Sequence, residues 1–126
     1  MNSEETLRIR QLFDALVNEP LHPFPERGGL NITGLKGVYI IYQDNIVAHV
    51  GNTRTGKDGL CQRLNNHIYG QSSFVRNYLQ PKHLTVRTGF SFQFLPVANA
   101  RERVLLEALA CGMLCPLHVG LHTVLD

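Results

Sequence analysis

Two basic side chains stand at a spacing that suits phosphate chemistry. Arg63 and His67 are four residues apart in a segment whose leucines recur at helical spacing, so both side chains would project from one face of a helix. A guanidinium offers planar, bidentate hydrogen bonds to a phosphate, and a histidine beside it can donate a hydrogen bond or transfer a proton. A solvated helix face that includes Asn66 is the alternative interpretation.

A carboxylate interrupts an otherwise apolar helical run near the end of the chain. Glu107 stands in the segment Val-Leu-Leu-Glu-Ala-Leu-Ala, and a charge in such surroundings needs a partner because an unpaired buried charge is costly. One interpretation is an exposed salt bridge with Arg103, one helical turn earlier. The other is a metal-ligating carboxylate that faces a cleft.

Tyr39 lies inside a β-type run, where packing is the usual role of a tyrosine. Because strand side chains alternate, Tyr39, Ile41 and Gln43 are expected on one face and Val38 and Ile40 on the other. The interpretation of Tyr39 as a functional residue therefore depends on what else reaches its face.

The elements that would position these residues follow from periodicity and turn chemistry. Two strands joined by a turn at Gln43-Asp44-Asn45 predict an antiparallel hairpin, and the whole order predicts an α/β mixture built on a small antiparallel sheet. The predicted elements are a helix over 3–17, a loop over 19–36, strands over 37–42 and 46–50, a helix from about 60 to 68, a short helix over 74–79, a strand over 84–97 bent near Gly89, and a helix over 100–114 capped by Asn99.

Composition limits the classes of protein to consider. The 126 residues suit one compact domain, and 44% of them are hydrophobic, enough to build a core. A net charge of +2 does not by itself indicate a nucleic-acid partner, so phosphate binding would need local clusters of charge. The three cysteines suggest no disulfide framework, and neither a signal peptide nor a membrane span is evident. We therefore expect a soluble cytoplasmic protein.

Together these features resemble the GIY-YIG nuclease family over residues 34–118. Gly37-Val38-Tyr39 resembles the first motif, and His49-Val50-Gly51 stands at the usual distance of the second. The resemblance is completed by Thr53 after the second motif, by Arg63 and His67 on the next helix, and by Glu107 with Pro116 nine residues later.

The resemblance implies a three-stranded antiparallel sheet flanked by helices, within one domain over 1–126. In that domain residues 1–33 would form an N-terminal helix and a wrapping loop, and residues 34–118 would carry the motifs. It also implies a metal-dependent DNA endonuclease. Glu107 would bind Mg²⁺ or Mn²⁺, since Mg²⁺ commonly takes only one or two protein carboxylates. Arg63 would hold the scissile phosphate, and Tyr39 would be the general base or would orient the attacking water. His49 and His67 would assist by hydrogen bonding or proton relay.

DNA would be contacted by residues near these motifs, and specificity would come from loops, a homodimer or a protein partner. The predicted contacts are basic side chains and hydroxyls able to touch a phosphate backbone: Arg54, Lys57, Ser72, Ser73 and Arg76.

Two departures from the family pattern stand out. His49 replaces the second tyrosine, so activity would rise with pH through its pKa, near 6.5 in an unperturbed histidine. An asparagine that the family carries near the end is replaced by His118 or Val119. A catalytically inactive module that binds DNA or protein and keeps the fold is therefore an alternative. A zinc site at Cys111, Cys115 and His118 is a second one.

Overall fold

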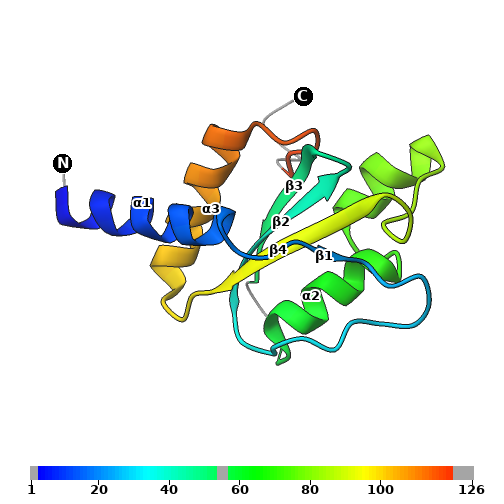
Figure 1. Ribbon diagram of the computed structural model, residues 1–126, viewed down its shortest axis with the longest axis horizontal. Helices are drawn as coiled ribbons and strands as arrows, with labels where there is room; N and C mark the ends of the chain where they lie inside the picture. The colour runs from blue at the N-terminus through cyan, green and yellow to red at the C-terminus, as the bar shows by residue number, and fades with distance from the viewer. Residues whose placement is uncertain (1–2, 54–56, 121–126) are drawn as a thin grey trace.

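The computed structural model describes residues 3–53 and 57–120, which form an antiparallel sheet covered by helices on both faces (Figure 1). The strands lie in the order β1-β4-β2-β3. Helices α1 and α3 cover one face, and α2 covers the other. In chain order the elements are α1 (Ser3–Val17), β1 (His22–Pro23), β2 (Gly37–Gln43), β3 (Ile46–Asn52), α2 (Gly59–Ile68), a π-helical turn (Val75–Leu79), a 3₁₀ turn (Gln80–Lys82), β4 (Phe90–Pro96) and α3 (Ala100–Leu114). The predicted α/β mixture on an antiparallel sheet is confirmed.

The sheet has four strands, where three were expected. β1 is a two-residue strand inside the predicted loop over 19–36, and it pairs with Phe92 and Ser91 of β4. Its proline is compatible with the outer edge of the sheet, where no ladder hydrogen bond is needed from that nitrogen.

The last strand is shorter than predicted. β4 begins at Phe90, because residues 86–89 form a turn that ends at Gly89 with a φ of +80°. The Gly89 carbonyl accepts a hydrogen bond from the Asp44 N–H of the hairpin turn at 2.9 Å, so Gly89 fixes where β4 starts beside β2.

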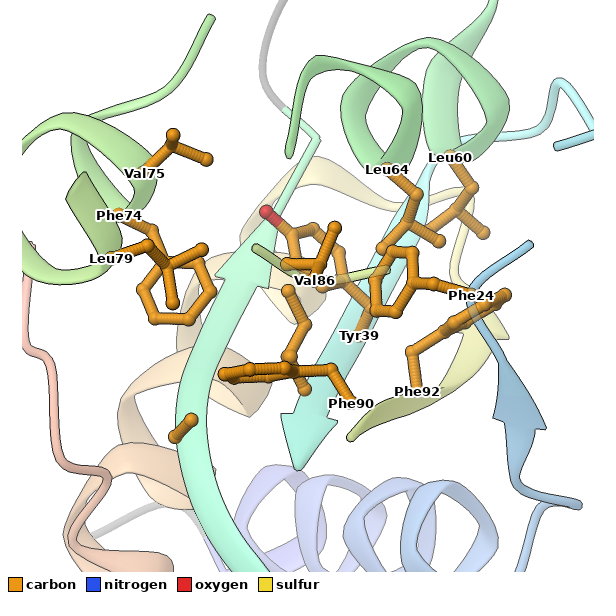
Figure 2. Close-up of a cluster of buried hydrophobic side chains, with 12 residues drawn as sticks. Phe24, Tyr39, Leu60, Leu64, Phe74, Val75, Leu79, Val86, Phe90 and Phe92 are labelled. Carbon is orange, nitrogen blue, oxygen red and sulfur yellow. The ribbon is translucent and has the colours of Figure 1, made fainter. Parts of the chain in front are cut away.

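Alternation along β2 divides the core into two clusters. Val38 and Ile40 pack toward α1 and α3, while Tyr39 and Ile41 pack into the cluster beneath α2 (Figure 2). In the register of the hairpin, Tyr39 lies opposite Gly51, and Ile41 lies opposite His49. His49 and Tyr39 are therefore diagonal neighbours on the face that α2 covers.

Helix α3 is set by its cap and by its packing on α1. The Asn99 side chain accepts a hydrogen bond from the Glu102 N–H at 2.9 Å, as predicted for an N-cap. Arg103, one turn before Glu107, is buried and donates to the carbonyls of Val97 and Ala98.

No helix in the described ranges is both long and apolar enough to cross a bilayer.

Candidate active site

A cleft of about 1050 Å³ opens along the outer edge of β3. Two carbonyls of this strand, at Val47 and Ala48, accept hydrogen bonds from the backbone N–H groups of Leu117 and His118. Beyond that pairing, the strand lines the cleft from His49 to Asn52. One side is the α2 wall, formed by Gly59, Gln62, Arg63, Asn66, Gln71, Ser72, Ser73, Arg76 and Asn77. The other is the α3 wall, formed by Val104, Glu107, Ala108, Cys111, Val119 and Gly120.

The five predicted catalytic residues lie at this cleft or directly behind it. Arg63 lines the cleft from the α2 wall, Glu107 lines it from the α3 wall, and His49 lines it from β3. Tyr39 and His67 are buried, with 0% and 1% of their surface exposed. Gly51 lines the cleft and lies directly against the phenol, since a Cβ there would lie 2.2 Å from the Tyr39 hydroxyl oxygen. The motif glycine thus lets the strand backbone lie against the phenol.

The predicted DNA contacts are placed less uniformly. Ser72, Ser73 and Arg76 line the cleft from the α2 wall. Lys57 is exposed but is not among the residues that line it. Arg54 lies outside the described residues.

Behind the α2 wall, a chain of hydrogen bonds runs from strand to helix to loop. The Tyr39 hydroxyl lies 2.7 Å from Nε2 of His67, and Nδ1 of His67 lies 2.8 Å from Oγ of Ser72. Oγ of Ser72 also accepts from the Val75 N–H at 3.2 Å, as the cap of the following helical turn. Ser72 was expected to touch DNA, but its hydroxyl holds His67 in place.

The neighbouring guanidinium sets the direction of these bonds. Arg63 lies beside the Tyr39 phenol, where its charge and N–H groups lower the pKa of the phenol against the effect of burial. A guanidinium only donates, so toward Arg63 the phenol oxygen is the acceptor, and its O–H remains available for Nε2 of His67. With that direction, the proton of a neutral His67 lies on Nδ1, from which it is donated to Ser72. The chain is consistent with a neutral imidazole.

Burial dominates the protonation states of this network. It raises the pKa of Tyr39 to about 12 despite Arg63, and it lowers the pKa of His67 well below 6.5, helped by His49 and Arg63. Tyr39 therefore keeps its proton at neutral pH, and His67 is a neutral acceptor.

His49 is also neutral, which corrects the pH dependence expected from the sequence. Burial, followed by the nearby His118 and Arg63, lowers the pKa of His49 to about 3. Its ring stacks on Phe74 at a centroid distance of 4.7 Å, and its Nδ1 lies 3.1 Å from Nδ1 of His118. The expected step in activity near pH 6.5 is therefore wrong for His49.

On the opposite face of β3, the structure adds a residue that sequence reasoning missed. Nδ2 of Asn52 donates to Oε1 of Glu107 at 3.4 Å. Asn52 is 7% exposed, and its Oδ1 is buried without a hydrogen-bond partner among the described residues. The available signal was its position, because Asn52 directly follows the motif glycine and alternation turns it away from His49 and toward α3.

The donor set at Glu107 suits a hard divalent cation. A carboxylate and an unpartnered amide oxygen beside an open cleft are oxygen donors of the kind that Mg²⁺ binds, with water filling its other positions. Within residues 3–53 and 57–120, no three His, Cys, Asp or Glu side chains come together as a metal site. The zinc alternative at Cys111, Cys115 and His118 is thus not supported.

Comparison with known proteins identifies the fold. No protein-family model matches the sequence, and no curated protein matches it. Among solved structures, the chain is similar to the GIY-YIG N-terminal endonuclease domain of UvrC from Thermotoga maritima bound to its catalytic magnesium ion. That match has a TM-score of 0.50 and 19% identity, and it covers 89% of this chain and 97% of that one.

A point mutant of the same domain, in which alanine replaces an asparagine, is also bound to its catalytic divalent cation. It is matched with a TM-score of 0.51 and 18% identity, covering 89% of this chain and 94% of that one. At this identity the likeness concerns the fold, and the fold is the one that the sequence motifs predicted. The chain described here has the GIY-YIG endonuclease fold.

Proposed function

We propose that this protein is a divalent-metal-dependent endonuclease that hydrolyses a phosphodiester bond in DNA. The observation that carries the proposal is that Arg63 and Glu107 line one cleft from two different helices. The guanidinium is a bidentate group for phosphate, and the carboxylate is a ligand for a cation. The fold is shared with endonuclease domains that bind a catalytic divalent cation.

The two walls would divide the work on the substrate. Arg63 would hold the scissile phosphate, and Ser73 and Arg76 would contact the neighbouring backbone from the same wall. Glu107 would hold Mg²⁺ or Mn²⁺, which stabilises negative charge on the leaving oxygen when bound.

For Tyr39 we favour the role of orienting the attacking water over that of general base. A phenol with a pKa of about 12 keeps its proton at neutral pH, and its O–H is already directed to His67 at 2.7 Å. Arg63 lies beside this phenol, and Gly51 lies against it. His67 would hold the phenol in place. It would also accept the phenol proton if the bound substrate and cation favoured the ionised phenol.

A plasmid-nicking assay tests the proposal. Supercoiled plasmid is incubated with the protein in Mg²⁺, in Mn²⁺ and in EDTA, beside a Glu107→Gln variant purified in parallel. Nicking should require the metal and should fall by orders of magnitude in Glu107→Gln, whose circular dichroism should match that of the parent. Equal metal-dependent nicking by both proteins would exclude Glu107 as the ligand.

An inactive DNA-binding module is the second candidate, and the chemistry of the second motif favours it. His49 stands where a tyrosine is expected, packs against Phe74 and is neutral, so it brings no ionisable hydroxyl to the cleft. This candidate predicts DNA binding in a gel-shift assay by both the parent and Glu107→Gln, and no nicking by either.

A further inference from the structure

We infer that Asn52 supplies a second protein oxygen to the cation site at Glu107, through Oδ1. The inference rests on the proposed function, because it assumes that Glu107 holds a divalent cation. It goes beyond the motif residues, since Asn52 belongs to none of the positions that the sequence resemblance assigned.

The carboxamide of Asn52 lies beside Glu107. Alternation along β3 puts His49 and Gly51 on the α2 face, and Asn52 on the α3 face. There Nδ2 of Asn52 lies 3.4 Å from Oε1 of Glu107. Both side chains line the same cleft.

The amide of Asn52 is oriented by its contact with Glu107. A carboxylate only accepts hydrogen bonds, so the atom of Asn52 that lies 3.4 Å from Glu107 is Nδ2, and Oδ1 is the amide atom left out of that bond. The nitrogen and oxygen of an amide group have nearly the same shape, so the hydrogen-bond partner identifies which of the two atoms faces Glu107. Oδ1 is left buried, with no partner in the described part of the chain.

The surroundings of Oδ1 limit the kind of ligand that it can bind. Buried carbonyl oxygens are nearly always hydrogen-bonded, so an exception beside a cleft indicates a missing partner. The partner must bring positive charge or donors and must tolerate the neighbouring carboxylate, which disfavours an anion. A hydrated divalent cation meets both conditions, because it accepts an amide oxygen directly or offers it the hydrogen of a bound water.

Binding of Mn²⁺ without DNA tests the inference separately from catalysis. Mn²⁺ affinity is measured by electron paramagnetic resonance of the free ion and by calorimetry, for the parent, Asn52→Ala, Asn52→Asp and Glu107→Gln. Asn52→Ala should weaken binding by about 10- to 100-fold, the usual effect of losing a supporting group at a metal site. Asn52→Asp keeps an oxygen at the same place and should bind Mn²⁺ at least as tightly as the parent.

A matched control comes from another asparagine of the cleft. Asn66 lines the α2 wall, so Asn66→Ala should leave Mn²⁺ affinity unchanged. Thermal unfolding in EDTA confirms that each variant is folded. If Asn52→Ala does not fold, the isosteric Asn52→Leu replaces it in the same comparison.

The outcomes separate the possible failures. Asn52 could instead only hold Glu107 through Nδ2. Asn52→Asp would then lose that hydrogen bond and add repulsion between two carboxylates, so it should weaken Mn²⁺ binding as much as Asn52→Ala does. This result would overturn the inference. Unchanged affinity in Asn52→Ala would overturn it too, while Glu107→Gln still abolishes binding and the proposed function stands. If the parent itself binds no Mn²⁺, the cation site and the proposed function fail together.

Discussion

The two walls of the cleft differ in how complete they are. Behind the α2 wall, Tyr39, His67 and Ser72 satisfy one another through a chain of short hydrogen bonds. At the α3 wall, Asn52 reaches Glu107 with a long bond, and its Oδ1 has no partner among the described residues. The polar groups behind the α2 wall are already paired with one another in the folded protein. At the α3 wall, Oδ1 of Asn52 can still accept a ligand. Substitutions on the two walls should therefore fail in different ways.

The largest expected effects are on nicking and on the free energy of unfolding, in Tyr39→Phe behind the α2 wall and in Glu107→Gln on the α3 wall. Tyr39→Phe should reduce nicking by about 10²-fold, because the hydroxyl that would orient the attacking water is lost. It should also lower the free energy of unfolding by about 1–3 kcal/mol, since Nε2 of His67 loses its buried partner. Glu107→Gln should reduce nicking comparably with a smaller loss of stability. Urea unfolding beside nicking rates measures both, and equal stability losses would contradict the contrast between the walls.

The next effect is the acid sensitivity of the two buried histidines, His49 and His67. The pKa of His49 is lowered to about 3 and that of His67 well below 6.5, while both titrate near 6.5 in the unfolded chain. Below that value the unfolded chain binds more protons, so the free energy of unfolding should fall as pH drops from about 6.5 toward about 3. The slope reaches about 1.4 kcal/mol per pH unit for each histidine.

Urea unfolding at several pH values below neutrality measures that slope. His49→Phe keeps an aromatic ring on Phe74 and should remove one histidine's share of it. His22→Phe, at an exposed position, is the matched control. A slope in His49→Phe as steep as in the parent would show that His49 is not a source of the acid sensitivity.

A smaller effect is expected where the cleft meets the phenol. In Gly51→Ala the added Cβ would lie 2.2 Å from the Tyr39 ring and hydroxyl, so the ring or the strand must move, at a cost of about 1–3 kcal/mol. Gly112→Ala on α3 meets no atom within 4 Å and should stabilise the helix by about 0.5–1 kcal/mol. Thermal unfolding of the two variants should thus shift in opposite directions; a shift in the same direction would refute the close packing at Gly51.

The smallest effect concerns the end of the hydrogen-bond chain. Ser72→Ala removes the acceptor of Nδ1 of His67 and the cap of the next helical turn, so about 1–2 kcal/mol of stability should be lost. Nicking should fall less than in Tyr39→Phe, because the phenol stays. Ser73→Ala, its half-buried neighbour, should change stability by less than about 0.5 kcal/mol. Equal stability losses in the two serine variants would remove Ser72 from the network.

Local patterns predicted most of the fold. Alternation in β2 and β3 and the apolar spacing of α2 and α3 are properties of neighbouring residues, so they could be read along the chain. β1 could not, because two residues that include Pro23 have no strand pattern of their own and pair only through β4. The start of β4 was missed for a similar reason, since it depends on the contact between Gly89 and Asp44.

For the site, motif spacing predicted which residues meet but not what state they are in. Arg63 and Glu107 come to one cleft as expected. The protonation of His49 depends on burial under Phe74, which the sequence does not show. Asn52 was missed because its partner, Glu107, lies 55 positions later and is reached only through the packing of α3 on β3.

The order of the site along the chain has a consequence for synthesis. Tyr39 and Arg63 leave the ribosome well before Glu107, and the backbone that pairs with the edge of β3, at Leu117 and His118, emerges later still. A growing chain thus holds Arg63 before it has the Glu107 carboxylate that would complete the cleft. For the proposed nuclease, the capacity to cut would therefore arrive only once α3 has been synthesised.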